Sequence, residues 1–188
     1  MGEIEQGLKC LVDFLGFDRS SFAEFSPDGA ELNILCSVVV NDVSPLPEGP
    51  FPYPFHWYLG KLRAGGIVVV TSPDDLPSEA AAEIDYCHRT GLRSHLGIPI
   101  RIGGRLMGVV GFAAFRSIRA WPEDVVARLK IVGEVLWQAL ARSRAETESR
   151  WLRAQLWHSD RVARVGALTS SIAHELNQPL TAILSNAQ

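Results

Sequence analysis

The sequence predicts an α+β fold in which an antiparallel sheet is flanked by helices and followed by one long C-terminal helix. Two long apolar runs, His95–Ile102 and Leu106–Phe115, are joined at Gly103-Gly104. A Gly-Gly pair between such runs indicates a β-hairpin, because a tight hairpin turn needs positive φ angles. From Pro122 to Gln188 the sequence has helical character throughout. The two signals place a sheet domain first and a helical extension after it.

The segments before the hairpin alternate between helical and strand periodicity. Helices are expected at Glu3–Leu15, Phe55–Ala64 and Ser78–Arg89, and strands at Arg19–Phe25, Leu32–Val40 and Ile67–Thr71. The turn residues Ser26-Pro-Asp-Gly29 separate the first two strands. Residues 41–54 carry prolines at positions 45, 47, 50, 52 and 54, so a loop is expected there.

Composition and charge restrict the class of protein. Hydrophobic residues make up 47% and charged residues 21% of the 188 positions, as in ordinary soluble globular proteins. The net charge of −3 gives no basic field for nucleic acid or an anionic membrane. No apolar run reaches the length of a membrane span, and the three cysteines are too widely spaced for a metal motif and are expected to be free thiols. We therefore expect a cytoplasmic protein with no nucleic-acid partner, no membrane span and no metal site.

The hairpin resembles the core of one known domain family. The segment Gly91-Leu-Arg-Ser-His-Leu-Gly-Ile-Pro-Ile-Arg-Ile-Gly-Gly-Arg-Leu-Met-Gly-Val-Val-Gly-Phe112 is similar to the GAF sensory domain. In that family a Ser-x-Leu-x-x-Pro-Ile strand turns at Gly-Gly into a Gly-Val-x-Gly-Phe strand. The resemblance implies a GAF-type antiparallel sheet in a sensor domain over residues 1–120, closed by a helix that extends to about position 145. It also implies either a pocket for a small molecule, such as a cyclic nucleotide, haem, bilin or metabolite, or a domain that binds only a partner protein; the sequence leaves the ligand unknown.

The long helix begins with residues that favour a helix start. Pro122 suits the first helical position, and Glu123 and Asp124 complement the positive end of the helix dipole. Apolar residues then recur at alternating spacings of four and three, as in a coiled coil: Val125, Leu129, Val132, Leu136 and Ala139. Polar residues interrupt this pattern, and it resumes further along the helix in another register. We interpret residues 121–160 as a signalling helix linker, with a solvated connector of no signalling role as the alternative.

A histidine followed by a carboxylate lies near the C-terminus, in the run His174-Glu175-Leu176-Asn177-Gln178-Pro179. Apolar residues around it recur at the spacing of a helix seam that faces a partner helix: Val165, Ile172, Leu176 and Ile183. This spacing places His174 on the face furthest from the seam, where an incoming domain can reach the imidazole. A neutral imidazole is a nucleophile, so the pattern is compatible with a phosphoryl acceptor; a solvated surface histidine is the alternative.

This run resembles the phosphoacceptor motif in the dimerisation and histidine-phosphotransfer domain of bacterial sensor histidine kinases. The resemblance implies that residues 161–188 are the first helix of that domain, truncated, with His174 as phosphoacceptor and Glu175 as base or orienting group. Asn177 and Gln178 represent the Asn-Gln variant of the motif. Many related kinases have Thr or Asn at the second of these positions, so Gln178 is a possible phosphatase position.

The same resemblance implies partners and cofactors. It predicts a homodimer, a response regulator that accepts the phosphoryl group, and ATP with Mg²⁺ bound by a domain that these 188 residues do not contain. The predicted function is a protein-histidine kinase of a two-component phosphorelay, with this chain inactive by itself. The main alternative is a non-enzymatic dimeric regulator whose GAF domain binds a small ligand. A third possibility is a GAF-fold redox enzyme that uses Cys87.

Other sequence features bear on the unknown ligand. Cys87-His88 resembles the pair that anchors bilin in phytochrome-like GAF domains, but no Tyr follows at the expected spacing and the run to the core strand is too short. His56, His88 and His95 are candidate haem ligands, although lone histidines are usually structural. A redox enzyme related to the free methionine sulfoxide reductases would need clustered cysteines.

Aromatic residues are concentrated between positions 51 and 58. They either form the lid of a small-molecule pocket or cover the sheet, and they are Phe51, Tyr53, Phe55, Trp57 and Tyr58.

Overall fold

The structure, a computed structural model, confirms the α+β fold with a GAF-type sheet and a long C-terminal helix. It describes residues 2–40 and 42–185, and the side chains of these residues except at positions 3, 156 and 158–185. Within the described residues the strands are β1 (Arg19–Phe25), β2 (Leu32–Val39), β3 (Gly49–Pro50), β4 (Val68–Val70), β5 (Ser94–Ile102) and β6 (Arg105–Ala114). The helices are α1 (Gly2–Leu15), α2 (His56–Arg63), α3 (Ala81–Thr90) and α4 (Glu123–Ser185), with short 3-10 turns at Pro73–Asp75 and Ser78–Ala80.

The strands form one antiparallel sheet in the order β3-β2-β1-β6-β5-β4. The predicted hairpin of β5 and β6 is confirmed, and its turn residues Gly103 and Gly104 have φ angles of 59° and 81°. Side chains alternate between the two sheet faces along each strand, as the period of two requires. A bulge opposite the Phe22/Ala23 step of β1 keeps the cross-strand pairs on common faces, so that Phe22 and Cys36 share one face while Ala23 and Ile34 share the other.

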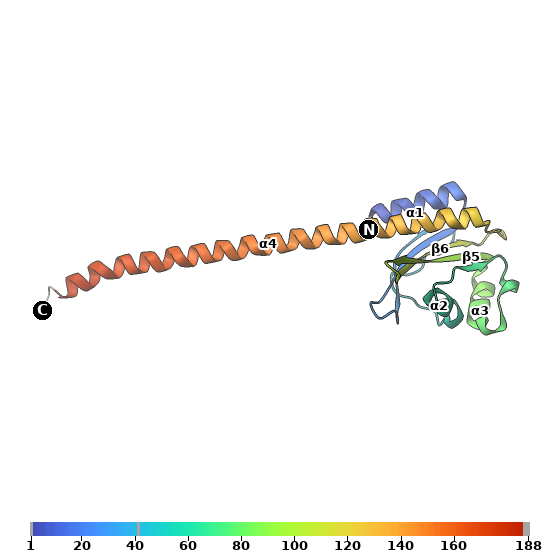
Figure 1. The fold of residues 1–188 in the computed structure, drawn as a ribbon, viewed down its shortest axis with the longest axis horizontal. Helices are drawn as coiled ribbons and strands as arrows, with labels where there is room; N and C mark the ends of the chain where they lie inside the picture. The colour runs from blue at the N-terminus through green and yellow to red at the C-terminus, as the bar shows by residue number, and fades with distance from the viewer. Residues whose placement is uncertain (1, 41, 186–188) are drawn as a thin grey trace. The chain divides into compact units, whose positions relative to one another are not determined.

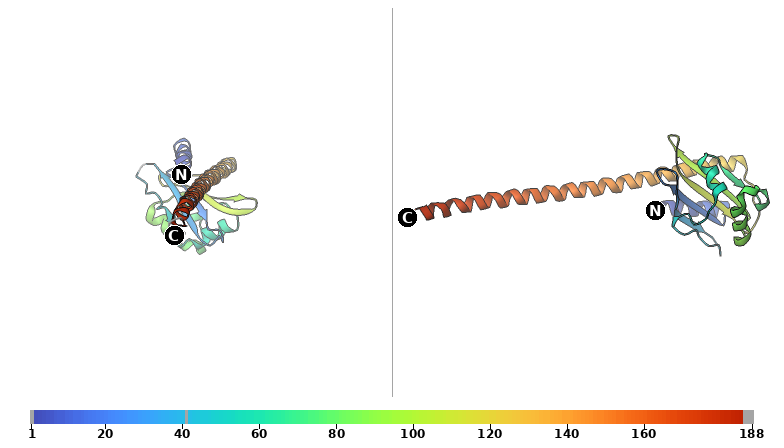
Figure 2. Two further views of the ribbon diagram at one scale, coloured as in Figure 1. Left: turned by 90° about the vertical axis from the view of Figure 1, so that its left-hand side faces the viewer. Right: turned by 90° about the horizontal axis from the view of Figure 1, so that it is seen from below.

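Helices cover both faces of the sheet. Figure 1 and the left view of Figure 2 show α1 and the first part of α4 on one face and α2 and α3 on the other. The core on the α1/α4 face is formed mainly by large apolar side chains, among them Leu8, Val12, Phe22, Ile98, Phe112, Leu129 and Trp137. Each such burial contributes roughly 1.5–3 kcal/mol to folding. This face is a closed core, and the α2/α3 face carries the candidate site.

Two local differences from the sequence-based expectation have simple physical reasons. The proline-rich loop contains the short strand β3, which pairs with β2 at the edge of the sheet. An edge strand tolerates proline, because no further strand requires the backbone N–H that proline lacks. The helix expected over Ser78–Arg89 begins as a 3-10 turn and becomes α-helical only at Ala81. It ends at Gly91, which adopts the left-handed conformation typical of a helix C-cap.

The first part of the apolar stripe on α4 has a different partner from the one expected. The coiled-coil spacing over Val125–Ala139 predicted a seam against a second chain, but Leu129, Trp137 and Leu140 are buried against this chain's own sheet. A helix seam and a helix face that covers a sheet have the same apolar periodicity, so sequence alone does not separate them. Ile131 and Val135 in the same stretch are exposed, as are Trp151, Leu152 and Trp157 further along α4.

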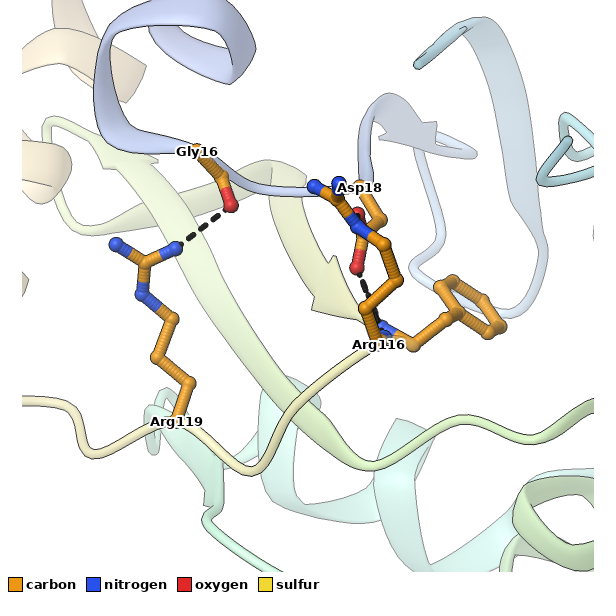
Figure 3. Close-up of polar contacts among 5 residues, drawn as sticks. Gly16, Asp18, Arg116 and Arg119 are labelled. Carbon is orange, nitrogen blue, oxygen red and sulfur yellow. Dashed lines mark hydrogen bonds and ion pairs between the residues drawn. The ribbon is translucent and has the colours of Figure 1, made fainter. Parts of the chain in front are cut away.

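Asp18 and Arg119 fix the connection between β6 and α4 (Figure 3). The buried Asp18 carboxylate accepts hydrogen bonds from the backbone N–H groups of Phe115 (2.7 Å) and Arg116 (3.2 Å) and from the Arg116 guanidinium. The Arg119 guanidinium donates a hydrogen bond to the Gly16 carbonyl (2.8 Å) at the C-terminal end of α1. A positive charge interacts favourably with the helix dipole at this end. The segment that leads into α4 is therefore bonded to the end of α1 and the start of β1.

These bonds make stability depend on pH. Burial raises the pKa of Asp18, but the backbone hydrogen bonds from Phe115 and Arg116 and the Arg116 guanidinium outweigh burial and hold the pKa below the ordinary value of 3.8. A carboxylate whose pKa is lower in the folded than in the unfolded protein stabilises the fold when it is ionised. That contribution is fully present above the unfolded pKa and is lost as the pH falls below it.

We expect Asp18→Asn to lower the free energy of unfolding by roughly 1–3 kcal/mol near pH 7, because it removes hydrogen bonds to a buried charge. The difference between wild type and Asp18→Asn should shrink at about pH 3, since the Asp18 carboxyl of the unfolded chain is then largely protonated and folding has to ionise it. Urea denaturation at both pH values measures this. Asp85→Asn is the matched control, because Asp85 pairs with Arg89 on the surface and should change little. An equal difference at both pH values would contradict the assigned role of Asp18.

Beyond Leu140 the chain forms a second unit, which comprises Ala141–Gln188 and contains the rest of α4. Its polar surface carries the pairs Arg142–Glu146 (3.0 Å) and Arg150–Glu146 (3.7 Å), while Trp151, Leu152 and Trp157 are exposed. No helix in the described part of the chain combines the length and apolarity that a membrane span requires.

Candidate functional site

A pocket lies between the sheet and helices α2 and α3, and we call it the central pocket. Strands β1, β2, β4, β5 and β6 supply its floor, and the segment 46–58 and helix α3 supply its walls. Its apolar lining is formed by Ala23, Leu32, Ile34, Leu46, Val70, Leu76, Leu92, Val109 and Ala113. Its polar lining is formed by Arg19, Ser21, Glu83, Cys87 and His95. The free volume in this conformation is about 70 Å³, which is small for an organic ligand.

The aromatic residues between positions 51 and 58 both line this pocket and cover the sheet, so the two roles considered from the sequence coincide. Tyr53 stacks on Phe55 with ring centroids 5.1 Å apart, and Phe51 meets both rings edge-on at 5.6 and 5.5 Å. Tyr86 from α3 lies 4.7 Å from the Tyr53 ring. The rings themselves fill most of the space between the loop and the sheet.

Two neutral polar side chains form one wall of the central pocket. His95 Nε2 and the Tyr58 hydroxyl are 3.1 Å apart. Burial, together with the positive charge of Arg19, lowers the pKa of His95 to about 3, so the imidazole is neutral at physiological pH. Burial raises the pKa of Tyr58 far above its usual range, so the phenol keeps its proton. This pair can donate or accept a hydrogen bond without adding charge.

The carboxylate of Glu83 is held by the start of α2. Its Oε1 atom accepts a hydrogen bond from the backbone N–H of Tyr58 at 2.9 Å. This N–H belongs to the first turn of a helix whose N-cap residue, Phe55, provides no side-chain cap. Glu83 on α3 therefore caps α2 from another element, and the helix dipole favours its negative charge.

A second cavity, the side cleft, adjoins the central pocket and shares Arg19, Tyr53 and Tyr86 with it. Its volume is about 480 Å³, and its remaining lining is mostly from the loop 42–45 and the residues Phe115 and Arg116. Arg19 is only 7% exposed, although it sits between the two cavities. Neither Arg19 nor Glu83 was identified from the sequence as a site residue. The sequence offers no clear signal for either residue, because β1 also contains Ser20, Ser21 and Glu24, and Glu83 is one of several polar residues of α3.

The other candidate ligands from the sequence lie in different places. His95 is in the central pocket, whereas His56 and His88 are exposed. Among the residues with described side chains, no group of three His, Cys, Asp or Glu residues could hold a metal ion.

The three cysteines are well separated. Cys36 and Cys87 are buried on opposite sheet faces, and Cys10 is exposed on α1. Burial raises the pKa of both buried thiols to about 11, with the charge of Glu83 adding to the effect at Cys87. Protonated thiols are poor nucleophiles, and this arrangement disfavours a cysteine-based redox site.

The predicted phosphotransfer residues His174, Glu175, Asn177 and Gln178 lie within α4, but their side chains are outside the described ones. The expected surface position of His174 therefore stays a prediction.

A comparison with protein families decides what the first unit is. The model of the GAF domain family matches residues 6–140. This chain belongs to the GAF domain family. The matched residues include the whole sheet, α1 from Gln6 onward, α2, α3 and the part of α4 that packs on the sheet. The central pocket is thus the internal cavity of a GAF domain.

Solved GAF domains have the same fold. GAF3 of Slr1393 from Synechocystis sp. PCC6803, in its photoproduct state, is 19% identical with a TM-score of 0.65, and the match covers 78% of this chain and 96% of that one. The blue-light-absorbing form of the PixJ GAF domain from Thermosynechococcus elongatus is 16% identical with a TM-score of 0.61, covering 78% and 87%. JSC1_58120g3, with bound biliverdin IXa, is 16% identical with a TM-score of 0.59, covering 73% and 86%. At these identities the likeness concerns the fold alone. No curated protein matches the chain in sequence.

Proposed function

We propose that this chain is the sensor part and first phosphotransfer helix of a sensor histidine kinase in a two-component system. The observation that carries the proposal is the run His174-Glu175-Leu176-Asn177-Gln178-Pro179, in the helix that begins on the GAF core at Glu123. His174 accepts the γ-phosphoryl group of ATP: the N–P bond forms as the bond from the γ-phosphorus to the β–γ bridging oxygen breaks, and ADP leaves. Glu175 orients the imidazole or accepts its proton. The direct test is whether the intact gene product gains an acid-labile phosphate at His174.

The proposed reaction also requires a nucleotide-binding domain and a response regulator. ATP and Mg²⁺ bind to a domain outside these 188 residues, and a response regulator in the same compartment, the cytoplasm, receives the phosphoryl group. Gln178 is one helical turn from His174, where an amide can hold the water that removes phosphate from the regulator. Its side chain is longer than that of Thr or Asn, so we expect phosphatase activity to be weak.

The GAF domain senses a small molecule in the central pocket and controls the phosphotransfer helix through α4. Arg19 lines the pocket, and its guanidinium carbon lies 4.9 Å from the centre of the Phe115 ring. Phe115 begins the connection into α4 that Asp18 holds. A ligand that moves Arg19 therefore acts on a residue that precedes the helix. A bilin is not proposed, because no Tyr follows Cys87-His88 at the expected spacing and the run to the core strand is too short.

The proposed kinase is a homodimer. Trp151, Leu152 and Trp157 are exposed on the part of α4 beyond the GAF unit, and nothing in the described part of the chain covers them. Large apolar side chains that are exposed on a helix and that no domain covers favour association with a second copy. The covered stripe up to Leu140 does not contribute, since it packs on the sheet.

We expect the 188-residue chain to dimerise in solution and the double variant Trp151→Glu/Leu152→Glu to be mainly monomeric, because four carboxylates would meet in the seam. Light scattering at micromolar concentrations measures the mass. Arg153→Glu is the matched control, since Arg153 is the next exposed residue on the helix and is already polar. A wild-type monomer, or a double variant that remains dimeric, would contradict this dimer seam.

A further inference from the structure

Arg19 is a buried cation that faces two cavities. Its side chain comes from β1 and lines both the central pocket and the side cleft. One guanidinium nitrogen donates to the Ser44 carbonyl at 3.2 Å, and another donates to the Tyr86 hydroxyl at 3.1 Å. Both partners are neutral, and further guanidinium N–H groups are left for a bound molecule.

Within the part of the chain whose side chains are described, Arg19 has no carboxylate as a hydrogen-bond partner. Among the residues with described side chains, none forms an ion pair with Arg19. Glu83 is the other charged side chain of the central pocket, and its carboxylate caps α2. Arg116, the other arginine of the side cleft, is paired with Asp18. A buried charge without an ionic partner is unfavourable by several kcal/mol, so an anion at Arg19 would be bound strongly.

The rest of the central pocket suits a flat apolar group. Its floor is mainly aliphatic and its walls are mainly aromatic rings, and the neutral pair of Tyr58 and His95 adds hydrogen-bonding groups without charge. The present free volume of about 70 Å³ is too small for an aromatic ring and its substituents, so the rings must move. Tyr53 is half-buried and is shared with the side cleft, so its outward rotation joins the two cavities.

We propose that the central pocket and the side cleft together bind a small aromatic carboxylic acid, whose carboxylate pairs with Arg19 and whose ring replaces the Tyr53 side chain against the sheet. A monoanion is favoured over a phosphate, because one guanidinium matches one charge and Arg116 is already paired. The planar guanidinium holds a carboxylate in a bidentate arrangement that a single amide cannot reproduce. This inference names the ligand class for the sensor role proposed above, and so it rests on that role.

Direct binding to the 188-residue chain tests the proposal. Benzoate, cinnamate, 2-naphthoate and indole-3-acetate would each be compared with the matching primary amide by calorimetry. We expect at least one carboxylate to bind roughly 10- to 100-fold more tightly than its amide. If none binds more tightly than its amide, the proposal is wrong. Because no phosphorylation is measured, this result and that of the kinase test are independent.

Variants then locate the preference. Arg19→Gln should abolish the advantage of the carboxylate over the amide, and Arg19→Lys should reduce it, because lysine keeps the charge but not the planar fork. Arg128→Gln is the control, because Arg128 is an exposed arginine of α4 that lines neither cavity, and it should leave the advantage unchanged. Circular dichroism checks folding; if Arg19→Gln is unfolded, the comparison of Arg19→Lys with Arg128→Gln decides. A carboxylate preference that Arg19→Lys retains in full, or that Arg128→Gln removes, would overturn the assignment to Arg19.

Discussion

The intact gene product should gain one phosphate on nitrogen, and His174→Gln should abolish it. Phosphorylation on imidazole gives a bond that is labile in acid and stable in base, which distinguishes it from phosphate on serine or aspartate. The amide of glutamine cannot act as the nucleophile, so no residual labelling is expected. Glu175→Gln should slow labelling by roughly 10²- to 10⁴-fold, the usual effect of losing a general base. Radiolabelled ATP with acid and base treatment measures both.

His158→Gln is the matched control for this experiment. His158 lies on the same helix, but serine rather than an acid follows it, so labelling should be unchanged. Phosphate that persists in the His174→Gln protein would place the acceptor elsewhere. A wild-type protein that is never labelled would favour the alternative function, a non-enzymatic dimeric regulator that binds a small ligand through its GAF domain.

The fold was largely predictable because its strongest signals are local. Gly103-Gly104 between two apolar runs specifies a hairpin whatever surrounds it. Apolar periodicity likewise specified α1 and α4 as helices. What α4 packs against was not local information. The stripe through Leu129 was assigned to a second chain, whereas it is buried on the sheet, because periodicity reports that a face is apolar and not what covers it.

The candidate site was predictable only in part, for a related reason. The aromatic loop was identified because aromatic residues concentrate there in sequence. Arg19, Glu83 and His95 come from three elements and meet only in the folded chain. The proposed role of Arg19 in binding an anion depends on its burial and on the absence of a carboxylate close to it among the described residues. Neither property can be derived from the residue type or its neighbours in sequence.

Gly108→Ala should strongly lower the stability of the GAF domain. Gly108 lies in β6, paired with Glu24 of β1 and Ile100 of β5. A Cβ atom there would be 2.2 Å from the Ala23 carbonyl oxygen and 2.9 Å from Cζ3 of the buried Trp137. Side-chain rotation cannot relieve the first clash, because its partner is the backbone of a central strand. We expect a loss of about 3 kcal/mol or more in the free energy of unfolding, at the upper end of overpacking effects.

Thermal denaturation measures this effect, and about 3 kcal/mol corresponds to a decrease in Tm of roughly 6–12 °C for a chain of this size. Gly60→Ala is the matched control, since Gly60 lies in α2 and a Cβ atom there meets nothing within 4 Å. It should be neutral or stabilising by up to about 1 kcal/mol, because alanine favours a helix over glycine. Trp137→Leu in the Gly108→Ala background should recover only part of the loss, because it relieves the contact with α4 and leaves the contact with Ala23. Full recovery would mean that the helix, and not the neighbouring strand, requires glycine at this position.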